Sequence, residues 1–268
     1  MANTFDQFAA FGTDIVGLER ILRGVQSLLQ IFAAWPMLLT YISSSLSIEK
    51  ISLLAVSFGI LQSRVGLARR IIRTFFFLNS FKGGYTLVQG KTSDQGVEVW
   101  LDVLNKSMLG IWGMLESVTL LDMFAIPGLE VFGPVKTGEY NRQAQICWFV
   151  ALVASTLSGL VKISKTAERG SEAGQDPTKV KEKISNGKEK VKESKDKTVA
   201  VKDAQASAKV RQLSIKVVAD IMDMILPASG VGWVNVDGGI VASVMLVTTF
   251  LTGKDAWYRC GREVAAKA

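Results

Sequence analysis

The sequence predicts an all-α protein: a membrane-associated helical bundle with N-terminal amphipathic helices and apolar helical hairpins. Three observations predict it. Of the 268 residues 49% are apolar, and the mean hydropathy is positive at +0.28. Over long stretches the apolar side chains recur at the three- and four-residue spacing of a helix face. The charged residues gather in one segment, so the apolar residues are concentrated elsewhere, which indicates membrane association.

The first predicted region, residues 1–95, carries amphipathic helices. Asp14 stands where an acidic side chain can accept hydrogen bonds from the free amides of a following helix. Apolar spacing predicts that helix over residues 15–34, before a Trp-Pro pair that disfavours the helical conformation. A second helix is expected over residues 48–81. Two glycines directly after it would end it.

The stretch over residues 62–81, QSRVGLARRIIRTFFFLNSF, joins arginines and aromatic residues without an acid. On a helix its arginines lie opposite a broad apolar face, which suits a membrane interface with anionic headgroups. The alternative is a helix of a soluble bundle whose polar face is basic. The candidate headgroup-binding residues are Arg64, Arg69, Arg70 and Arg73, and the candidate membrane-inserting residues are Leu67, Ile71, Phe75 and Leu78.

Two uncharged apolar runs predict membrane hairpins. The first covers residues 146–161, and the second covers residues 239–252, with tryptophan and arginine after it. Each approaches the length that crosses a bilayer, although a buried core helix is the alternative. We therefore expect a first membrane helical hairpin over residues 96–161. A C-terminal membrane hairpin with a basic tail is expected over residues 213–268.

Between the hairpins lies a charged segment, predicted as a flexible linker over residues 162–212. It is of low complexity and cannot bury enough apolar surface to fold alone, so we expect it to be disordered or loosely helical. Most of the net charge of +7 sits there. The segment has no aromatic side chain on which bases could stack, so nucleic acid is not an expected partner.

Several kinds of chemistry lack the residues they need. The chain has no histidine, which removes histidine-based catalysis and histidine metal sites. Its two cysteines form no metal-binding spacing, and no phosphate-binding loop occurs. The N-terminus lacks the basic segment of a secretory signal. We therefore expect no enzyme, no catalytic residue, no cofactor and no metal.

Taken together, these features resemble the peroxisomal membrane peroxins of the peroxin-eleven family, in a form like the fungal ones. The resemblance covers essentially the whole chain. It rests on the amphipathic N-terminal region, the basic helix SRVGLARRIIRTFFFLNSF, the LLD element at residues 120–122 and the glycine-rich apolar segment that ends in Trp257.

This resemblance implies a peroxisomal membrane protein that elongates the membrane through its basic amphipathic helix and promotes peroxisome fission and proliferation. It implies binding to an anionic phospholipid membrane and self-association as a homo-oligomer. It also implies cooperation with a dynamin-like GTPase and its fission adaptor.

Orientation and two rival functions stay open. Lysines and arginines are dense near both termini and in the linker, which favours N- and C-termini that face the cytosol. If only two segments span, the linker faces the matrix. A peroxisomal membrane pore for small metabolites is the alternative function, since acids occur within apolar helices. These acids are Glu116, Asp122, Asp220 and Asp223. A soluble helical adaptor is the third possible function.

Overall fold

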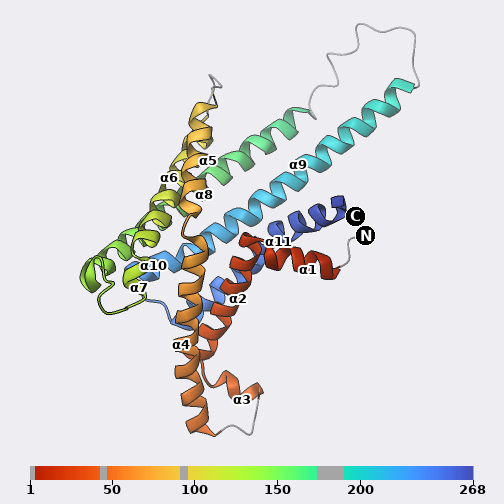
Figure 1. Ribbon diagram of the computed structural model, residues 1–268. Helices are drawn as coiled ribbons and strands as arrows, with labels where there is room; N and C mark the ends of the chain where they lie inside the picture. The colour runs from red at the N-terminus through yellow and green to blue at the C-terminus, as the bar shows by residue number, and fades with distance from the viewer. Residues whose placement is uncertain (1–3, 43–46, 91–95, 174–189, 268) are drawn as a thin grey trace.

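The computed structural model describes residues 4–42, 47–90, 96–173 and 190–267, and all regular secondary structure in these ranges is helical (Figure 1). Three of the described helices are long and apolar enough to cross a membrane: Ile48–Arg73, Gly133–Glu168 and Gly238–Ala266. The predicted all-α, membrane-compatible bundle is confirmed. The Gly133–Glu168 and Gly238–Ala266 helices contain the predicted apolar runs. The Ile48–Arg73 helix was not predicted to cross, and its basic part from residue 62 onward was expected to lie in the membrane interface.

The N-terminal helices begin and end where local sequence dictates. Helix α1 (Thr4–Thr13) leads into α2 (Ile15–Ala34), and the carboxylate of Asp14 accepts a hydrogen bond from the Gly17 amide at 3.0 Å. This confirms the predicted cap and the predicted helix over residues 15–34. The Trp-Pro pair ends α2, and the short α3 (Leu38–Ile42) follows.

The predicted helix over residues 48–81 is divided. Helix α4 (Ile48–Arg73) ends at Thr74, and α5 (Phe76–Gln89) continues past the glycine pair that was expected to stop it. At the break the Thr74 hydroxyl bonds to the Ile71 carbonyl at 2.8 Å, and the Ser117 hydroxyl donates to the Thr74 carbonyl at 2.5 Å. Such side-chain bonds compete with the helical ladder and bend a helix. The break thus coincides with a contact from a distant helix, which periodicity does not reveal.

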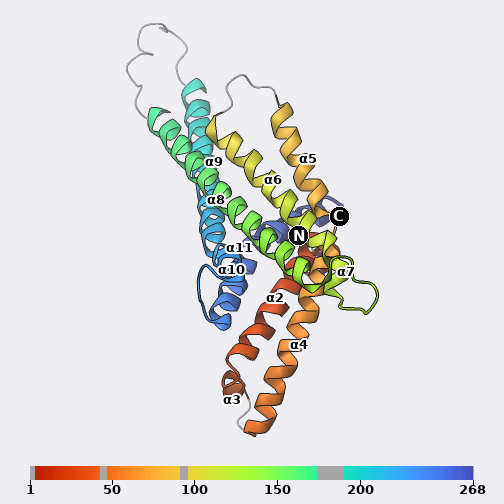
Figure 2. The ribbon, with the colours of Figure 1, turned by 90° about the vertical axis from the view of Figure 1, so that its left-hand side faces the viewer.

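Helices α6 (Val97–Val118), α7 (Leu120–Met123) and α8 (Gly133–Ala173) form a hairpin in which α6 packs along α8 (Figure 2). Asp122 organises the connection, because one of its oxygens accepts hydrogen bonds from the three amides of residues 131–133 at 2.9–3.0 Å. On its other side α6 lies against α5. There the tight approach of Phe81 leaves no room for a side chain at Gly110.

The C-terminal part consists of α9 (Lys190–Asp223), α10 (Ile225–Val231) and α11 (Gly238–Lys267). Helix α8 continues past residue 161, and α9 begins well before residue 213, so neither helix ends at the predicted edges of the linker. Residues 174–189 of that predicted linker lie outside the described residues. The division into regions 1–95, 96–161, 162–212 and 213–268 stays a prediction.

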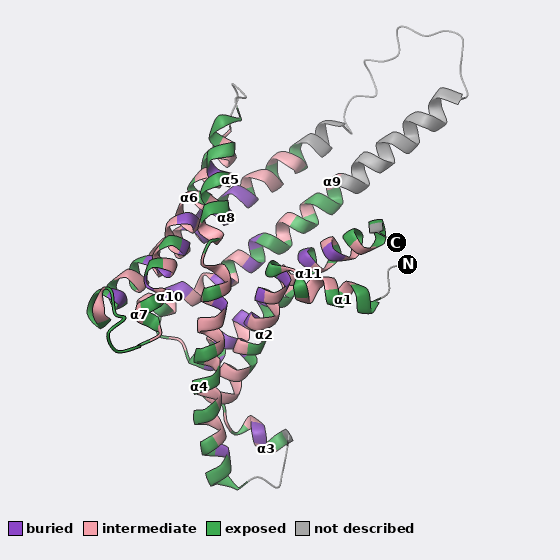
Figure 3. Cartoon of the chain, viewed as in Figure 1, coloured by how far each residue is buried: buried purple, intermediate pink, exposed green. Residues whose placement is uncertain are grey.

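Six helices close into a ring. In order, α2 packs on α4, α4 on α6, α6 on α8, α8 on α9, α9 on α11, and α11 again on α2. We call this the helix ring. From it the second half of α2, α3 and the first half of α4 extend together, with most of their surface exposed or half-buried (Figures 1 and 3). On the α2 side, Gln30 and Trp35 still contact Gly238 and Gly239 at the start of α11. This projection, residues 24–42 and 47–63, is called the α2–α4 arm.

Candidate functional site

The basic stretch turns most of its arginines toward the inside of the helix ring. The guanidinium of Arg69 is buried, with Nη2 2.6 Å from Glu19 Oε1 and Nη1 2.5 Å from Gln26 Oε1. Arg73 Nη2 lies 3.1 Å from Glu116 Oε2. These arginines therefore tie α4 to α2 and to α6.

The other two predicted arginines differ in exposure. Arg70 is half-buried and donates from Nη1 to Asn141 Oδ1 at 2.9 Å, with Nε 3.7 Å from Glu116 Oε1. Arg64 is exposed to the surroundings of the molecule. The structure thus brings Arg69, Arg70 and Arg73 together around two carboxylates, whereas Arg64 lines the same cavity as these three but has an exposed side chain. Headgroup binding by the four stays a prediction.

The predicted membrane-inserting residues mostly face outward. Ile71, Phe75 and Leu78 are exposed to 48%, 70% and 54%, and Leu67 is half-buried. In water such exposure of large apolar side chains on one face is costly, whereas in a bilayer it is the stable arrangement. The outer face of α4 and α5 is therefore suited to contact with acyl chains.

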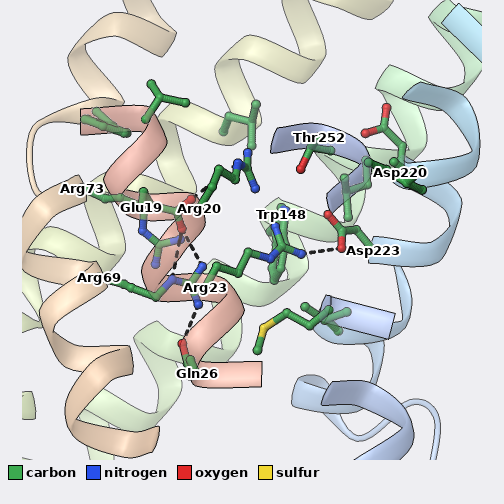
Figure 4. A pocket seen from close by; sticks show the side chains of 18 of the residues that line it. Glu19, Arg20, Arg23, Gln26, Arg69, Arg73, Trp148, Asp220, Asp223 and Thr252 are labelled. Atoms are coloured by element: carbon green, nitrogen blue, oxygen red, sulfur yellow. Dashed lines mark hydrogen bonds and ion pairs between the residues drawn. The ribbon is translucent and has the colours of Figure 1, made fainter. Parts of the chain in front are cut away.

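Glu19 is the centre of the buried charge cluster (Figure 4). Besides Arg69, its carboxylate lies 3.8 Å from Arg73 Nη1 and 3.7 Å from Arg20 Nε. Burial on its own would raise the pKa of the Glu19 carboxyl, but the charges of Arg69, Arg20 and Arg73 lower that pKa to about 2. Glu19 is therefore ionised under all ordinary conditions.

A second buried pair joins three helices on the opposite side. Arg23 Nη2 lies 2.5 Å from Asp223 Oδ1, and the Thr248 hydroxyl donates to the same oxygen at 2.6 Å. Arg23 and Asp223 have side chains exposed to only 7% and 10%. The pair thus fastens α2 to α9 and α11.

Between the two clusters lies a cavity of about 1160 Å³ at the middle of the helix ring (Figure 4). Its lining combines charge with large apolar surfaces, including Trp112, Trp148 and Met245. Arg73 stacks on Trp112 with its guanidinium carbon 5.0 Å from the ring centre. The basic residues that line the cavity are Arg20, Arg23, Arg64, Arg69, Arg70, Arg73, Arg211, Lys216 and Lys254, and the acidic ones are Glu19, Glu116, Asp220, Asp223 and Asp255.

Sequence reasoning missed the contribution of α2 to this site. Glu19, Arg20 and Arg23 fall on the polar face of an amphipathic helix, and a polar face ordinarily indicates contact with water. One feature of the sequence pointed to this contact: the basic stretch over residues 62–81 has no acid of its own, whereas the polar face of α2 carries Glu19. The sequence does not show, however, which face of each helix contacts the other.

The acids that suggested a pore are engaged in contacts. Glu116 pairs with Arg73, Asp122 binds backbone amides, and Asp223 pairs with Arg23. Asp220 accepts a hydrogen bond from the Ser155 hydroxyl at 2.6 Å, and Lys216 contacts both. Over the described ranges, His, Cys, Asp and Glu form no group of three that could hold a metal ion.

Comparison with known proteins gives one match. The family described as Peroxisomal biogenesis factor 11 (PEX11) matches residues 5–257, which is nearly the whole chain. No curated protein and no solved structure matched. The match includes the basic stretch, the first predicted hairpin, the charged segment, and the second predicted hairpin as far as residue 257. The three membrane-compatible helices agree with a place in the peroxisomal membrane. The chain therefore belongs to the PEX11 family of peroxisome biogenesis factors, which act in peroxisome proliferation at the peroxisomal membrane.

Proposed function

We propose that this protein elongates the peroxisomal membrane by inserting the outer face of α4 and α5 into one leaflet, and so promotes peroxisome fission. The observation that carries the proposal is the exposed apolar surface that Ile71, Phe75 and Leu78 form around the break between α4 and α5. A face of this kind that enters one leaflet expands it relative to the other and favours positive curvature. The proposal needs no catalytic step, and we infer that the protein is not an enzyme.

The arginines supply the electrostatic part of the proposal. Arg64 is exposed beside the apolar face and is placed to meet an anionic headgroup directly. Arg69, Arg70 and Arg73 hold Glu19 and Glu116 instead. To bind headgroups, these three must exchange a carboxylate for a phosphate, and α4 must turn within the helix ring.

The arrangement of the termini supports the proposed orientation. The side-chain amide of Gln7 donates to the Trp257 carbonyl at 2.9 Å, and Arg259 pairs with Asp14 at 2.7 Å. Helices α1 and α11, the first and last of the described helices, lie side by side (Figure 1). We propose that both face the cytosol. There the chain would self-associate and meet the dynamin-like GTPase and its adaptor.

The test uses the full chain reconstituted in vesicles with and without anionic phospholipid, examined by electron microscopy. Ile71→Ser with Phe75→Ser and Leu78→Ser is expected to abolish tubules, and Arg64→Glu is expected to weaken the need for anionic lipid. The matched control replaces exposed apolar residues of the α7–α8 connection, Leu129→Ser with Val131→Ser. The proposal fails if the triple variant forms tubules as the unmodified protein does.

A pore for small metabolites is the second candidate, and the cavity within the helix ring favours it. In this reading the cavity is one widening of a path across the membrane, lined by arginines that select anions. Arg20→Gln would then change the ratio of anion to cation conductance in a planar bilayer. A bilayer that stays electrically silent with the unmodified protein removes this candidate.

A further inference from the structure

The walls of the cavity in the helix ring contain hydrogen-bond donors that no described residue satisfies. The Nε atoms of Arg20, Arg23 and Arg73 and the indole nitrogen of Trp112 are buried without an acceptor among the described residues. All four residues line the same cavity. A buried donor without a partner costs about 1–3 kcal/mol, and more if it is charged. Four in one cavity point to a missing acceptor.

Two of these arginines lie beside the Glu19 carboxylate. Arg20 Nε is 3.7 Å from Glu19 Oε2 and Arg73 Nη1 is 3.8 Å from Glu19 Oε1, and both distances are too long for hydrogen bonds. Trp112 lies beneath the Arg73 guanidinium. The close view shows the side chain of Arg20 directed into the cavity, between Glu19 and Asp223 (Figure 4).

The net charge of the side chains that line the cavity also favours a bound anion. Nine basic and five acidic side chains line the cavity, and they leave a positive excess. Burial lowers the pKa of the Arg20 guanidinium from its usual value, while the charge of Glu19 acts in the opposite direction. A negatively charged ligand beside Arg20 would offset this cost.

We propose that the cavity binds a phosphate group, held by Arg20 with Arg73 and Trp112 beside it. A carboxylate offers two oxygens, whereas a phosphate group offers three or four, so one phosphate can accept hydrogen bonds from more than one of these side chains. The apolar part of the lining, with Trp148 and Met245, accommodates a body attached to the phosphate. The site needs no insertion of α4 and α5 into a leaflet, so it does not depend on membrane remodelling.

The phosphate has two possible sources, a phospholipid headgroup and a soluble organic phosphate. Calorimetric titration of the full chain in an uncharged detergent distinguishes them. The probes are dihexanoyl phosphatidic acid, glycerol 3-phosphate and inorganic phosphate, with dihexanoyl phosphatidylcholine for comparison. Binding of phosphatidic acid alone assigns the site to a lipid. Equal binding of glycerol 3-phosphate assigns it to a soluble ligand.

Arg20→Gln is the main variant, since Arg20 lies in no short ion pair. We expect its affinity for the bound probe to fall by about ten-fold or more, as for loss of one charged hydrogen bond. Trp112→Phe keeps an aromatic ring under Arg73 but removes the indole donor and one of the two fused rings, with an expected loss of about three-fold to ten-fold. Arg142→Gln is the matched control, because Arg142 is exposed and lies outside the cavity lining.

Thermal unfolding without ligand verifies that each variant is folded. If Arg20→Gln does not fold, Trp112→Phe decides the outcome. The proposal is overturned if none of the three phosphate probes binds the unmodified protein. It is also overturned if the folded cavity variants bind as tightly as Arg142→Gln.

Discussion

The two halves of α4 have opposite surroundings. The first half lies in the α2–α4 arm and is exposed, with Leu53 at 66%, Val56 at 62% and Ile60 at 58%. The second half enters the helix ring, where Arg69 is buried against Glu19. One continuous helix thus exposes its aliphatic part and buries its basic part. In a water-soluble protein the order of burial would be reversed.

This contrast shows that the apolar part of α4 is fitted to lipid and the basic part to protein. The α2–α4 arm contains only Glu49 and Lys50 as charged residues, both at its tip. An arm of this composition is stable where acyl chains surround it. Inside the helix ring, by contrast, each buried arginine needs a carboxylate. Four experiments test this contrast, in decreasing order of the change that we expect.

Loss of a buried acid is expected to have the largest effect. Asp223→Ala leaves Arg23 buried and unpaired, and should lower the free energy of unfolding by about 3–5 kcal/mol. Denaturant unfolding in detergent measures it. The double variant Arg23→Met with Asp223→Leu removes both charges, and should recover most of the loss. A loss that persists in the double variant would mean that shape, and not charge, holds α2 to α9.

A charge in the α2–α4 arm should act on insertion instead of on folding. Val56→Lys places a charge in the apolar part of α4, and should cost about 3 kcal/mol of membrane insertion if this half lies among acyl chains. Extraction of membranes with alkaline carbonate measures the change. Leu129→Lys, in an exposed connection, is the control. Equal extraction of the two variants would show that the arm lies outside the bilayer.

Acid should weaken the cluster around Glu19. The pKa of Glu19 is about 2, below the usual 4.5, so this pairing stabilises the fold fully above pH 4.5 and is lost as the pH falls toward 2. The expected loss is about 2–3 kcal/mol. Unfolding curves at several pH values measure it, with Glu19→Gln as the reference. If both proteins lose stability in parallel between pH 4.5 and 2, other carboxylates are responsible.

The exposed pair at the chain ends should matter least. Arg259 and Asp14 have side chains exposed to 42% and 26%. Arg259→Gln is expected to change the free energy of unfolding by less than about 1 kcal/mol, since solvent screens such pairs. Thermal unfolding of Arg259→Gln and of Asp223→Ala under the same conditions compares the two losses of stability. A change as large as that of Asp223→Ala would remove the distinction between inner and outer charges.

The sequence predicted the positions of the helices more completely than the contacts of the candidate site. The cap at Asp14, the end of α2 and the two apolar runs follow from short-range rules and agree with the structure. The break after Arg73 does not, since it coincides with a contact from Ser117. The inward turn of Arg69 depends on Glu19, 50 positions earlier. Helical periodicity separates a polar face from an apolar one but does not say which is inside.

The closure of the helix ring has a consequence for how the protein is made. Arg23 leaves the ribosome 200 residues before its partner Asp223. During that time Arg23 has no Asp223 to pair with, and α11 does not yet cover α2. The apolar face of α2 is then exposed next to its arginines. Partly made chains of this kind are prone to aggregate. Newly made chains are therefore exposed to aggregation until α9 and α11 have been synthesised.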